Sequence, residues 1–408
     1  MKSWEAPEIP RLPGHGLELR LFDSATQNIR PTAVGQTASI YVCGITPYDA
    51  THMGHANTYV AFDLLIRQWR DGGHSVNFVE NVTDIDDPLL KRAVETGQDW
   101  RAIAERETAL FREDMFALRV IPPSHYIGAV ESIPDVVSIV EQLQSQGDVY
   151  SVDGDLYFRI SRSPGFGSVS HLNQDRMIAL FGERGGDPDR QGKENALDPL
   201  LWQLEKPNEP AWNTPLGHGR PGWHIECSAI ALKFLGSTID VQGGGSDLVF
   251  PHHEMSAAQA ERVTGEIPFD RFYVHSGMVS WQGHKMSKSR GNLVFVSILR
   301  QEGVDPMAIR LALLAHHYRS DWAWTPHGLQ GAKDRLDLWR AAISQAVTMP
   351  SEILLTRVRE VLSDDLKTPS ALDAIDFWAQ ETLAGRGTES NGGALVRDLC
   401  DALLGVKL

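Results

Sequence analysis

The order of predicted strands and helices constrains the fold of this chain more than any other feature. An apolar strand is expected at 38–44 (ASIYVCG), followed by an amphipathic helix that ends at the glycine pair Gly72–Gly73. A second strand is expected at 75–87, after which Asp87–Pro88 provides a helix cap and first turn. Because neighbouring parallel strands need a crossover connection, usually a helix, this alternation predicts a parallel α/β sheet.

The pattern changes at about residue 98 and again at about residue 215. Two helical stretches and a hairpin with its turn at Asp153–Gly154 indicate an α/β insertion. Strands and helices then resume, with a last strand expected at 272–281 (FYVHSGMVSW), and the remainder is helical. We therefore predict a doubly wound, Rossmann-like catalytic domain at 1–97 and 216–296, an inserted connective subdomain at 98–215, and a C-terminal helical bundle at 297–408.

Composition narrows the class of protein. The 408 residues are 42% hydrophobic, enough for two or three domain cores, and contain no apolar run that would span a bilayer. The start resembles no signal peptide, which predicts a cytoplasmic protein. Three widely separated cysteines favour reduced thiols over a disulfide framework. The net charge of −15 disfavours a polyanionic partner such as a nucleic acid and favours a small-molecule acceptor.

Two segments at expected strand ends are suited to binding phosphates. His52 and His55 lie in an HMGH segment at a helix start, where free N–H groups and imidazoles can donate to phosphate oxygens. Lys285 and Lys288 lie in a Gly-flanked KMSKS segment, where two ammonium groups can neutralise a departing pyrophosphate. Alone, the first is typical of incidental polar residues and the second of a solvated surface loop.

The pair of segments resembles the two signatures of class I aminoacyl-tRNA synthetases. YVCGITPYDATHMGHA, NVTDIDD, GRPGWHIECSA and GGGSDLVFPHHE resemble cysteinyl-tRNA synthetases in the same order, across about 38–292. The resemblance implies activation of the L-cysteine carboxylate by ATP with Mg²⁺, on a HIGH/KMSKS nucleotidyl transferase fold. It also implies one zinc ion at Cys43, Cys227 and His252, residue types that suit this metal. Spacing alone favours buried structural cysteines and a capping histidine.

The same resemblance assigns further site residues and shows one departure. The family's usual fourth zinc ligand is a glutamate, and this chain has Ser256 there, which leaves an open position for the sulfur of the substrate. For Trp223, packing in the hydrophobic core is as good an explanation as contact with the substrate, because indole side chains bury readily. The implied ATP and adenylate contacts are Cys43, Gly44, Ile45, Thr46, Gly245, Ser246, Asp247 and Val279, and the implied cysteine contacts are Thr58, Asn81, Val82, Thr83 and Trp223.

The acceptor of the activated cysteine is indicated by two further features. The chain ends about 115 residues after the KMSKS segment, and it carries ERGGDP at 183–188 in a loop whose composition alone is typical of an exposed excursion. With Ser256, these features resemble the mycothiol-pathway ligases, which join cysteine to the amine of glucosaminyl-inositol. A shortened cysteinyl-tRNA synthetase and a non-catalytic cysteine- or adenylate-binding paralogue are the alternatives. The resemblance implies a monomer.

Overall fold

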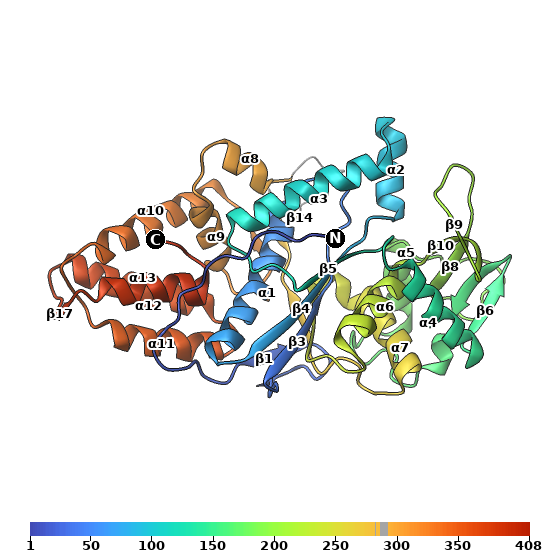
Figure 1. The fold of residues 1–408 in the computed structure, drawn as a ribbon, viewed down its shortest axis with the longest axis horizontal. Coiled ribbons are helices and arrows are strands. Elements are labelled where there is room, and N and C mark those ends of the chain that lie inside the picture. The colour runs from blue at the N-terminus through green and yellow to red at the C-terminus, as the bar shows by residue number, and fades with distance from the viewer. Residues whose placement is uncertain (282, 286–292) are drawn as a thin grey trace.

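The computed structural model describes residues 1–281, 283–285 and 293–408 of the chain. The molecule is elongated, with a parallel sheet at its centre (Figure 1). C-terminal helices form one end and an antiparallel subdomain forms the other. Near the N-terminus, β1 and β2 form a short hairpin, Arg20–Asp23 with Asn28–Pro31.

The central sheet has five parallel strands in the order β12-β11-β3-β4-β5. Their bounds are Thr37–Val42 (β3), Ser75–Val82 (β4), His125–Gly128 (β5), Val241–Gly245 (β11) and Tyr273–Ser276 (β12). The chain moves outward from β3 to β5, returns to the other side of β3 with β11, and continues outward to β12. This is the doubly wound order that the sequence predicts. The strand order reverses between β3 and β11, and folds of this kind bind ligands at the carboxyl ends of the strands where the order reverses.

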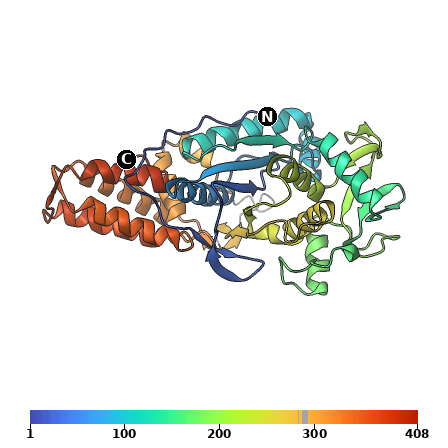
Figure 2. The ribbon, with the colours of Figure 1, turned by 60° about the horizontal axis from the view of Figure 1, so that its bottom comes forward.

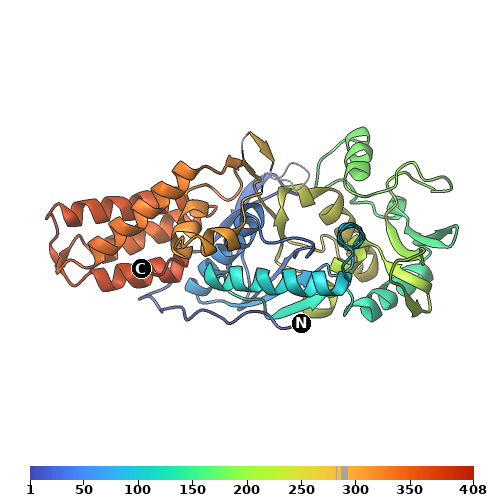
Figure 3. The same cartoon turned by 90° about the horizontal axis from the view of Figure 1, so that it is seen from above.

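Helices cover both faces of this sheet (Figure 2). Helix α1 (Met53–Asp71) packs against one face and α6 (Trp223–Leu235) against the other. Alternate residues of β3 therefore enter different cores: Val42 joins the core of α1, whereas Tyr41 and Cys43 join that of α6. Outside these, α2 (Asp87–Thr96) packs against α3 (Trp100–Ala117), and α7 (Glu254–Thr264) packs against α6. Figure 3 shows α3 lying across the end of the sheet.

The antiparallel subdomain follows β5. Its sheet has the order β6-β7-β8-β10-β9 and packs against α4. The hairpin turn predicted at Asp153–Gly154 is present, with positive φ at both residues. The bounds are Val149–Val152 (β6), Asp155–Phe158 (β7), Leu200–Leu204 (β8), Trp212–Thr214 (β9), Gly217–Pro221 (β10), Ile133–Ser145 (α4) and Gln174–Glu183 (α5). The domain boundaries stay a prediction. Strand β5 lies within the predicted insertion at 98–215, but it pairs with β4 of the central sheet.

The C-terminal region is helical, as predicted, and is tied to α1 by buried charges. Asp63 of α1 accepts from Arg67 and Arg310, and all three side chains are fully buried. Arg310 also donates to the carbonyl of Leu404 at 2.6 Å. The helices are Val296–Gln301 (α8), Pro306–Leu314 (α9), Pro326–Ile343 (α10), Ser351–Ser363 (α11), Thr368–Leu383 (α12) and Gly393–Leu404 (α13). The short strands are Val279–Trp281 (β13), His284–Lys285 (β14), Trp322–Ala323 (β15), Val347–Thr348 (β16) and Glu389–Ser390 (β17).

Two local expectations are wrong. The strand expected at 272–281 is two strands in different sheets, because the chain turns at Gly277, whose N–H donates to the carbonyl of Tyr318 at 2.7 Å. A Cβ at Gly277 would lie 2.2 Å from the carbonyl oxygen of Ser320, so only glycine fits. The N-cap of α2 was expected at Asp87 and is instead Asp86, whose carboxylate accepts a hydrogen bond from the N–H of Asp87 at 2.8 Å.

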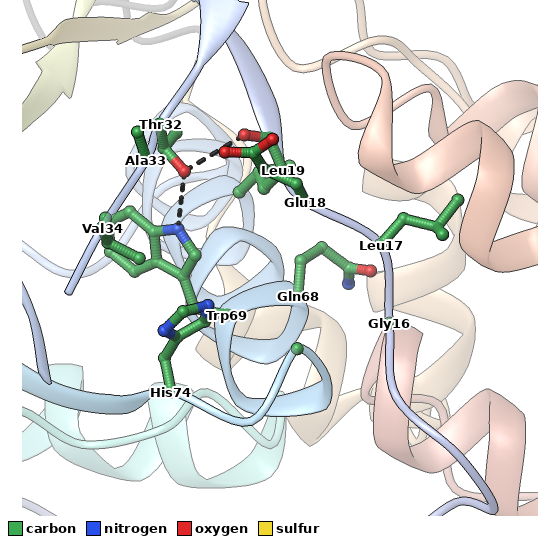
Figure 4. Close-up of a pocket in the computed structure, with 11 residues that line it drawn as sticks. Gly16, Leu17, Glu18, Leu19, Thr32, Ala33, Val34, Gln68, Trp69 and His74 are labelled. Atoms are coloured by element: carbon green, nitrogen blue, oxygen red, sulfur yellow. Dashed lines mark hydrogen bonds between the residues drawn. The ribbon is translucent and has the colours of Figure 1, made fainter. Parts of the chain in front are cut away.

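A cavity of about 250 Å³ lies at the end of α1 that is distant from the ligand-binding edge of the sheet (Figure 4). Trp69 donates to the hydroxyl of Thr32 at 3.2 Å and closes one side of it. Because α1 has 19 residues, this end is about 28 Å from the start of the helix. Within the described ranges, no helix combines the length and apolar character needed to cross a membrane.

Candidate active site and metal centre

Cys43, Cys227 and His252 come together at the carboxyl end of the central sheet. Cys43 follows β3, Cys227 lies on α6, and His252 lies in the short helical segment η3 (Val249–His253) that follows β11. Their ligand atoms lie within 4.8 Å of one another, and all three side chains are buried. His252 Nε2 is 3.2 Å from Cys227 Sγ. The three residues that the sequence proposes as ligands therefore form a possible metal site.

The donor set and its spacing fit zinc. Zinc prefers thiolate and imidazole ligands, and bonds of about 2.3 Å in a tetrahedron hold sulfur ligands roughly 3.8 Å apart. His252 Nε2 and Cys227 Sγ are 3.2 Å apart and all three ligand atoms lie within 4.8 Å of one another, so small side-chain adjustments would satisfy this geometry. The pKa of Cys227 is lowered well below its usual value, first because Cys43 hydrogen-bonds to its sulfur and also because His252 is adjacent. Burial raises the pKa of Cys43. One sulfur of the pair is thus poised as a thiolate.

Side chains behind His252 fix its orientation. Its Nδ1 is 3.0 Å from Nδ1 of His224, which leaves Nε2 directed at the thiols. The ring of Trp223 stacks on His252 with centroids 4.4 Å apart, and part of the indole remains exposed. The hydroxyl of Ser256 donates to the carbonyl of His224 at 3.2 Å, so it is engaged with the backbone. Trp223 is therefore a wall of the site and not a residue of the hydrophobic core.

A hydrogen-bond chain behind Cys43 was not anticipated from the sequence. Cys43 Sγ lies 3.2 Å from Nε2 of His253, and Nδ1 of His253 lies 2.8 Å from Nε2 of His275. Ser24 Oγ closes the chain at 2.7 Å from Nδ1 of His275. The doubled histidine in FPHHE was the available signal, but only the first of the two was singled out as a functional residue.

The histidines of the HMGH segment lie at the start of α1. His52 is the N-cap, and its Nδ1 accepts from the N–H groups of Gly54 at 3.1 Å and His55 at 3.4 Å. An accepting Nδ1 places the imidazole proton on Nε2, which can then act as a donor. The rings of His52 and His55 stack with centroids 3.8 Å apart.

The segment that follows KMSKS is attached to the same helix start. Met53 N–H donates to the carbonyl of Val294 at 2.9 Å, and Val296 N–H donates to the carbonyl of Thr51 at 3.0 Å. Residues 294–296, which follow the KMSKS segment in the chain, are therefore joined to the start of α1 by backbone hydrogen bonds. The backbone of Lys285 pairs with Ser280 in β14. The side chain of Lys285 and all of Lys288 lie outside the described residues.

The ends of β3 and β4 are joined by hydrogen bonds between predicted site residues. Asn81 Oδ1 accepts from the N–H of Gly44 at 2.8 Å, and Asn81 Nδ2 donates to the hydroxyl of Thr83 at 3.1 Å. Thr83 N–H donates to the carbonyl of Ile45 at 2.9 Å. A Cβ at Gly44 would lie 1.5 Å from the carbonyl oxygen of Asn81, so this position requires glycine. The side chain of Val82 packs in the core on the α1 side of the sheet.

The ends of β11 and β12 complete the edge. Thr58 on α1 lies 2.8 Å from the hydroxyl of Ser276. Ser246 and Asp247 open a short helical segment, η2 (Ser246–Leu248), directly after Gly245. The side chain of Val279 is buried in the core on the α1 side. Its backbone pairs with Trp322 of β15. Thr46 remains partly exposed.

The ERGGDP loop is attached to this edge. Arg184, at the end of α5, donates to the carbonyls of Asp247 and Phe250. Asp187 accepts from the hydroxyl of Tyr157 at 2.5 Å and pairs with Lys193 at 2.9 Å. The loop is therefore held in place at both ends, in contrast with the exposed excursion that its composition indicates.

The fold and this arrangement define the class of protein. Residues 30–334 match the family described as "tRNA synthetases class I (C) catalytic domain", and the chain belongs to this family. Solved structures agree: a Mycobacterium tuberculosis methionyl-tRNA synthetase bound by methionyl-adenylate superposes with a TM-score of 0.65 at 16% identity, covering 90% of this chain and 92% of the other. At that identity the likeness shows the fold alone.

Curated relatives are more specific. The chain is 59% identical to an "L-cysteine:1D-myo-inositol 2-amino-2-deoxy-alpha-D-glucopyranoside ligase" of Thermomonospora curvata, with both chains fully covered. Proteins of the same name in Streptosporangium roseum and Streptomyces coelicolor are 59% and 58% identical, again over the full length of both chains. The resemblance to mycothiol-pathway ligases expected from the ERGGDP loop and Ser256 is thereby confirmed.

Proposed function

We propose that this chain is an ATP-dependent ligase that activates L-cysteine as cysteinyl-adenylate and joins it to the amine of glucosaminyl-inositol. Full-length identity of 59% to ligases named for this substrate pair is the observation that carries the proposal. The buried Cys43, Cys227 and His252 cluster supports the choice of cysteine, because two thiols and an imidazole suit a metal that binds sulfur.

The first step forms the adenylate. A carboxylate oxygen of cysteine attacks the α-phosphorus of ATP, a P–O bond forms, and the bond to the β-phosphate oxygen breaks with departure of pyrophosphate. His52 and His55 at the start of α1 donate to phosphate oxygens, and Lys285 and Lys288 neutralise the departing charge. No covalent protein intermediate is needed, so the protein acts by positioning and electrostatics. Mg²⁺ enters with ATP, held mainly by its phosphates.

Cysteine is recognised at its sulfur. Cys43, Cys227 and His252 would hold a zinc ion, which would supply a Lewis acid that binds thiolate far better than hydroxyl. Trp223, stacked on His252, provides the wall of the aminoacyl pocket, and Thr58, Asn81, Thr83 and the backbone of Val82 line it. Serine lacks the thiol and is rejected without an editing step.

The adenylate is held by the backbone at the two innermost strand ends. Gly44, Ile45 and Thr46 follow Cys43, and Gly245, Ser246 and Asp247 lie at the end of β11. The Asp247 carboxylate accepts from ribose hydroxyls, and the backbone at Val279 contacts the base.

The second step joins the acceptor. The neutral amine of glucosaminyl-inositol attacks the adenylate carbonyl, an amide C–N bond forms, and the C–O bond to AMP breaks. The amine releases its proton to solvent, because a glucosamine amine is substantially neutral near physiological pH. We also propose that no nucleic acid takes part and that the chain acts as a cytoplasmic monomer.

The decisive experiment compares acceptors. Purified protein is given labelled cysteine, ATP and Mg²⁺ with either glucosaminyl-inositol or a tRNA pool, and the cysteinylated product is identified by mass spectrometry. We expect the amide with glucosaminyl-inositol and no charged tRNA. Charged tRNA would identify a shortened cysteinyl-tRNA synthetase, which shares the whole first step. Absence of cysteine-dependent exchange between pyrophosphate and ATP would point to a non-catalytic paralogue.

A further inference from the structure

The sulfur of Cys43 is the end of a buried hydrogen-bond chain that reaches the β1–β2 turn. The chain passes through His253 and His275 to Ser24, with successive separations of 3.2, 2.8 and 2.7 Å. Ser24 and His275 are 251 residues apart in the sequence. His253 has no exposed surface and His275 is 7% exposed. The four residues come from four separate segments, and their hydrogen bonds orient the ring of His253 with respect to the sulfur.

The hydrogen-bond chain has a consistent donor direction when Cys43 binds a metal ion, because metal-bound cysteine is a thiolate. Burial lowers the pKa of His275 to about 3, so its imidazole is neutral and has one donor and one acceptor nitrogen. If Ser24 donates to Nδ1 of His275, then Nε2 of His275 donates to Nδ1 of His253. The proton of His253 is then on Nε2, which faces Cys43 Sγ. Every donor points toward the sulfur.

The surroundings of His253 restrict its ring to this position. Gly244 lies against the ring, where a Cβ would be 3.0 Å from the imidazole carbon Cε1. Gln242 Nε2 donates to the same sulfur at 3.5 Å. Cys43 therefore faces two N–H donors, whereas His252, which contacts Cys227, belongs to the ligand cluster itself. This arrangement suits a sulfur that acts as a metal ligand, because N–H donors stabilise the negative charge of a buried metal-bound thiolate.

We propose that His253 is a positioning residue that donates an N–H···S hydrogen bond to Cys43 and thereby fixes this sulfur as a metal ligand, with His275 and Ser24 setting its tautomer. The inference rests on the metal site of the proposed function. Partners behind metal ligands orient them, and their loss typically weakens metal affinity by about 10- to 100-fold. The protein would hold its metal less tightly, and discriminate cysteine from serine less well, without His253.

Two substitutions separate the hydrogen bond from the space that the ring fills. His253→Gln places an amide N–H near the position of Nε2 and keeps the donor to sulfur. His253→Asn places its amide oxygen near Nδ1 and keeps the contact with His275, but it is too short to reach the sulfur. The two variants thus form a matched pair in which only one retains the bond under test.

Three measurements on the full-length protein test the proposal: zinc affinity by chelator competition, the thiolate-to-cobalt absorption band of Co²⁺-loaded protein, and the cysteine-to-serine ratio in pyrophosphate exchange. We expect His253→Asn to lower zinc affinity about 10- to 100-fold, shift the cobalt band and lower the ratio. His253→Gln should stay within about threefold of the unmodified protein on the same scale.

Thermal unfolding of both variants provides the control. Equal losses in both variants with equal drops in melting temperature would assign His253 a purely structural role and overturn the inference, as would full zinc affinity in His253→Asn. If the unmodified protein binds no zinc or cobalt, the metal part of the proposed function fails together with the inference. If it binds metal and only the His253 variants contradict the expectation, the inference alone fails.

Discussion

Arg184 offers the sharpest test of how the ERGGDP loop serves the site. Its guanidinium donates to the carbonyls of Asp247 and Phe250, on the segment that ends in His252. Arg184→Ala removes both hydrogen bonds and leaves two carbonyls without their donor. A hydrogen bond to a charged group contributes about 1.5–3 kcal/mol, and the lower value applies because Arg184 is only partly buried. The two bonds together then stabilise the segment by about 3 kcal/mol.

This free energy translates into a measurable local opening. Because about 1.4 kcal/mol corresponds to a factor of ten, the displaced population of residues 247–253 should rise roughly 100-fold in Arg184→Ala. Amide hydrogen exchange followed by mass spectrometry reports such openings directly. We expect protection of this peptide to fall by about two orders of magnitude, and pyrophosphate exchange with cysteine and ATP to slow, since Asp247 and His252 lie on it.

A neighbouring arginine provides the matched control. Arg190 pairs with Asp155 at 2.7 Å and donates to the carbonyl of Val152 at 3.2 Å, all within the antiparallel subdomain and its loop. Arg190→Ala should loosen the loop and leave protection of 247–253 unchanged. The reasoning would be refuted if Arg184→Ala changed that protection by less than threefold, or if Arg190→Ala reduced it equally.

Two further predictions concern the metal site and the anchor of α1. Cys227→Ala should abolish zinc binding, as measured by metal analysis, and should also abolish the preference for cysteine over serine. If the variant kept both properties, the metal site would be excluded. Asp63→Asn should lower the free energy of unfolding in urea by about 3–5 kcal/mol at neutral pH, because it leaves two buried arginines unpaired. Burial would raise the pKa of Asp63, but Arg310 and Arg67 hold it below its usual value. The ionised carboxylate of Asp63 therefore stabilises the folded protein above about pH 4. The difference in free energy of unfolding between the unmodified protein and Asp63→Asn should become smaller only below that pH. A smaller difference already at pH 6 would contradict this assignment.

The sequence predicts the sheet well because each element carries its own signal. Strand β3 is continuously apolar and α1 has a helical apolar pattern closed by Gly72 and Gly73, so local physics and tertiary packing agree. The N-cap of α2 was misplaced because Asp86 and Asp87 are equally good caps. Which of the two becomes the N-cap depends on where the helix begins, and helix propensity does not set this boundary to within one residue.

The candidate metal ligands were proposed only through resemblance to a family. Spacing carried no information, since Cys43 and His252 are distant in the sequence and meet because β3 and β11 are neighbours. The residues behind the ligands were missed for the same reason. Ser24 and His275 belong to separate segments, and nothing in the local sequence of either indicates a partner at the site. Arg184 lies in the ERGGDP segment, but its contacts with the carbonyls of Asp247 and Phe250 depend on tertiary packing.

Selection and activation share one edge of the sheet in the proposed function. The end of β3 supplies Cys43 for the metal and, one residue later, Gly44 for the adenylate, and Asn81 at the end of β4 holds that glycine at 2.8 Å. The end of β11 leads through Asp247 to His252, and Arg184 holds the segment between them. A displacement at any of these strand ends therefore moves a metal ligand and a nucleotide contact together. Because of this coupling, a substitution that displaces the strand ends should lower cysteine selectivity and ATP use together. A substitution confined to the residues behind the sulfur of one cysteine should lower cysteine selectivity alone.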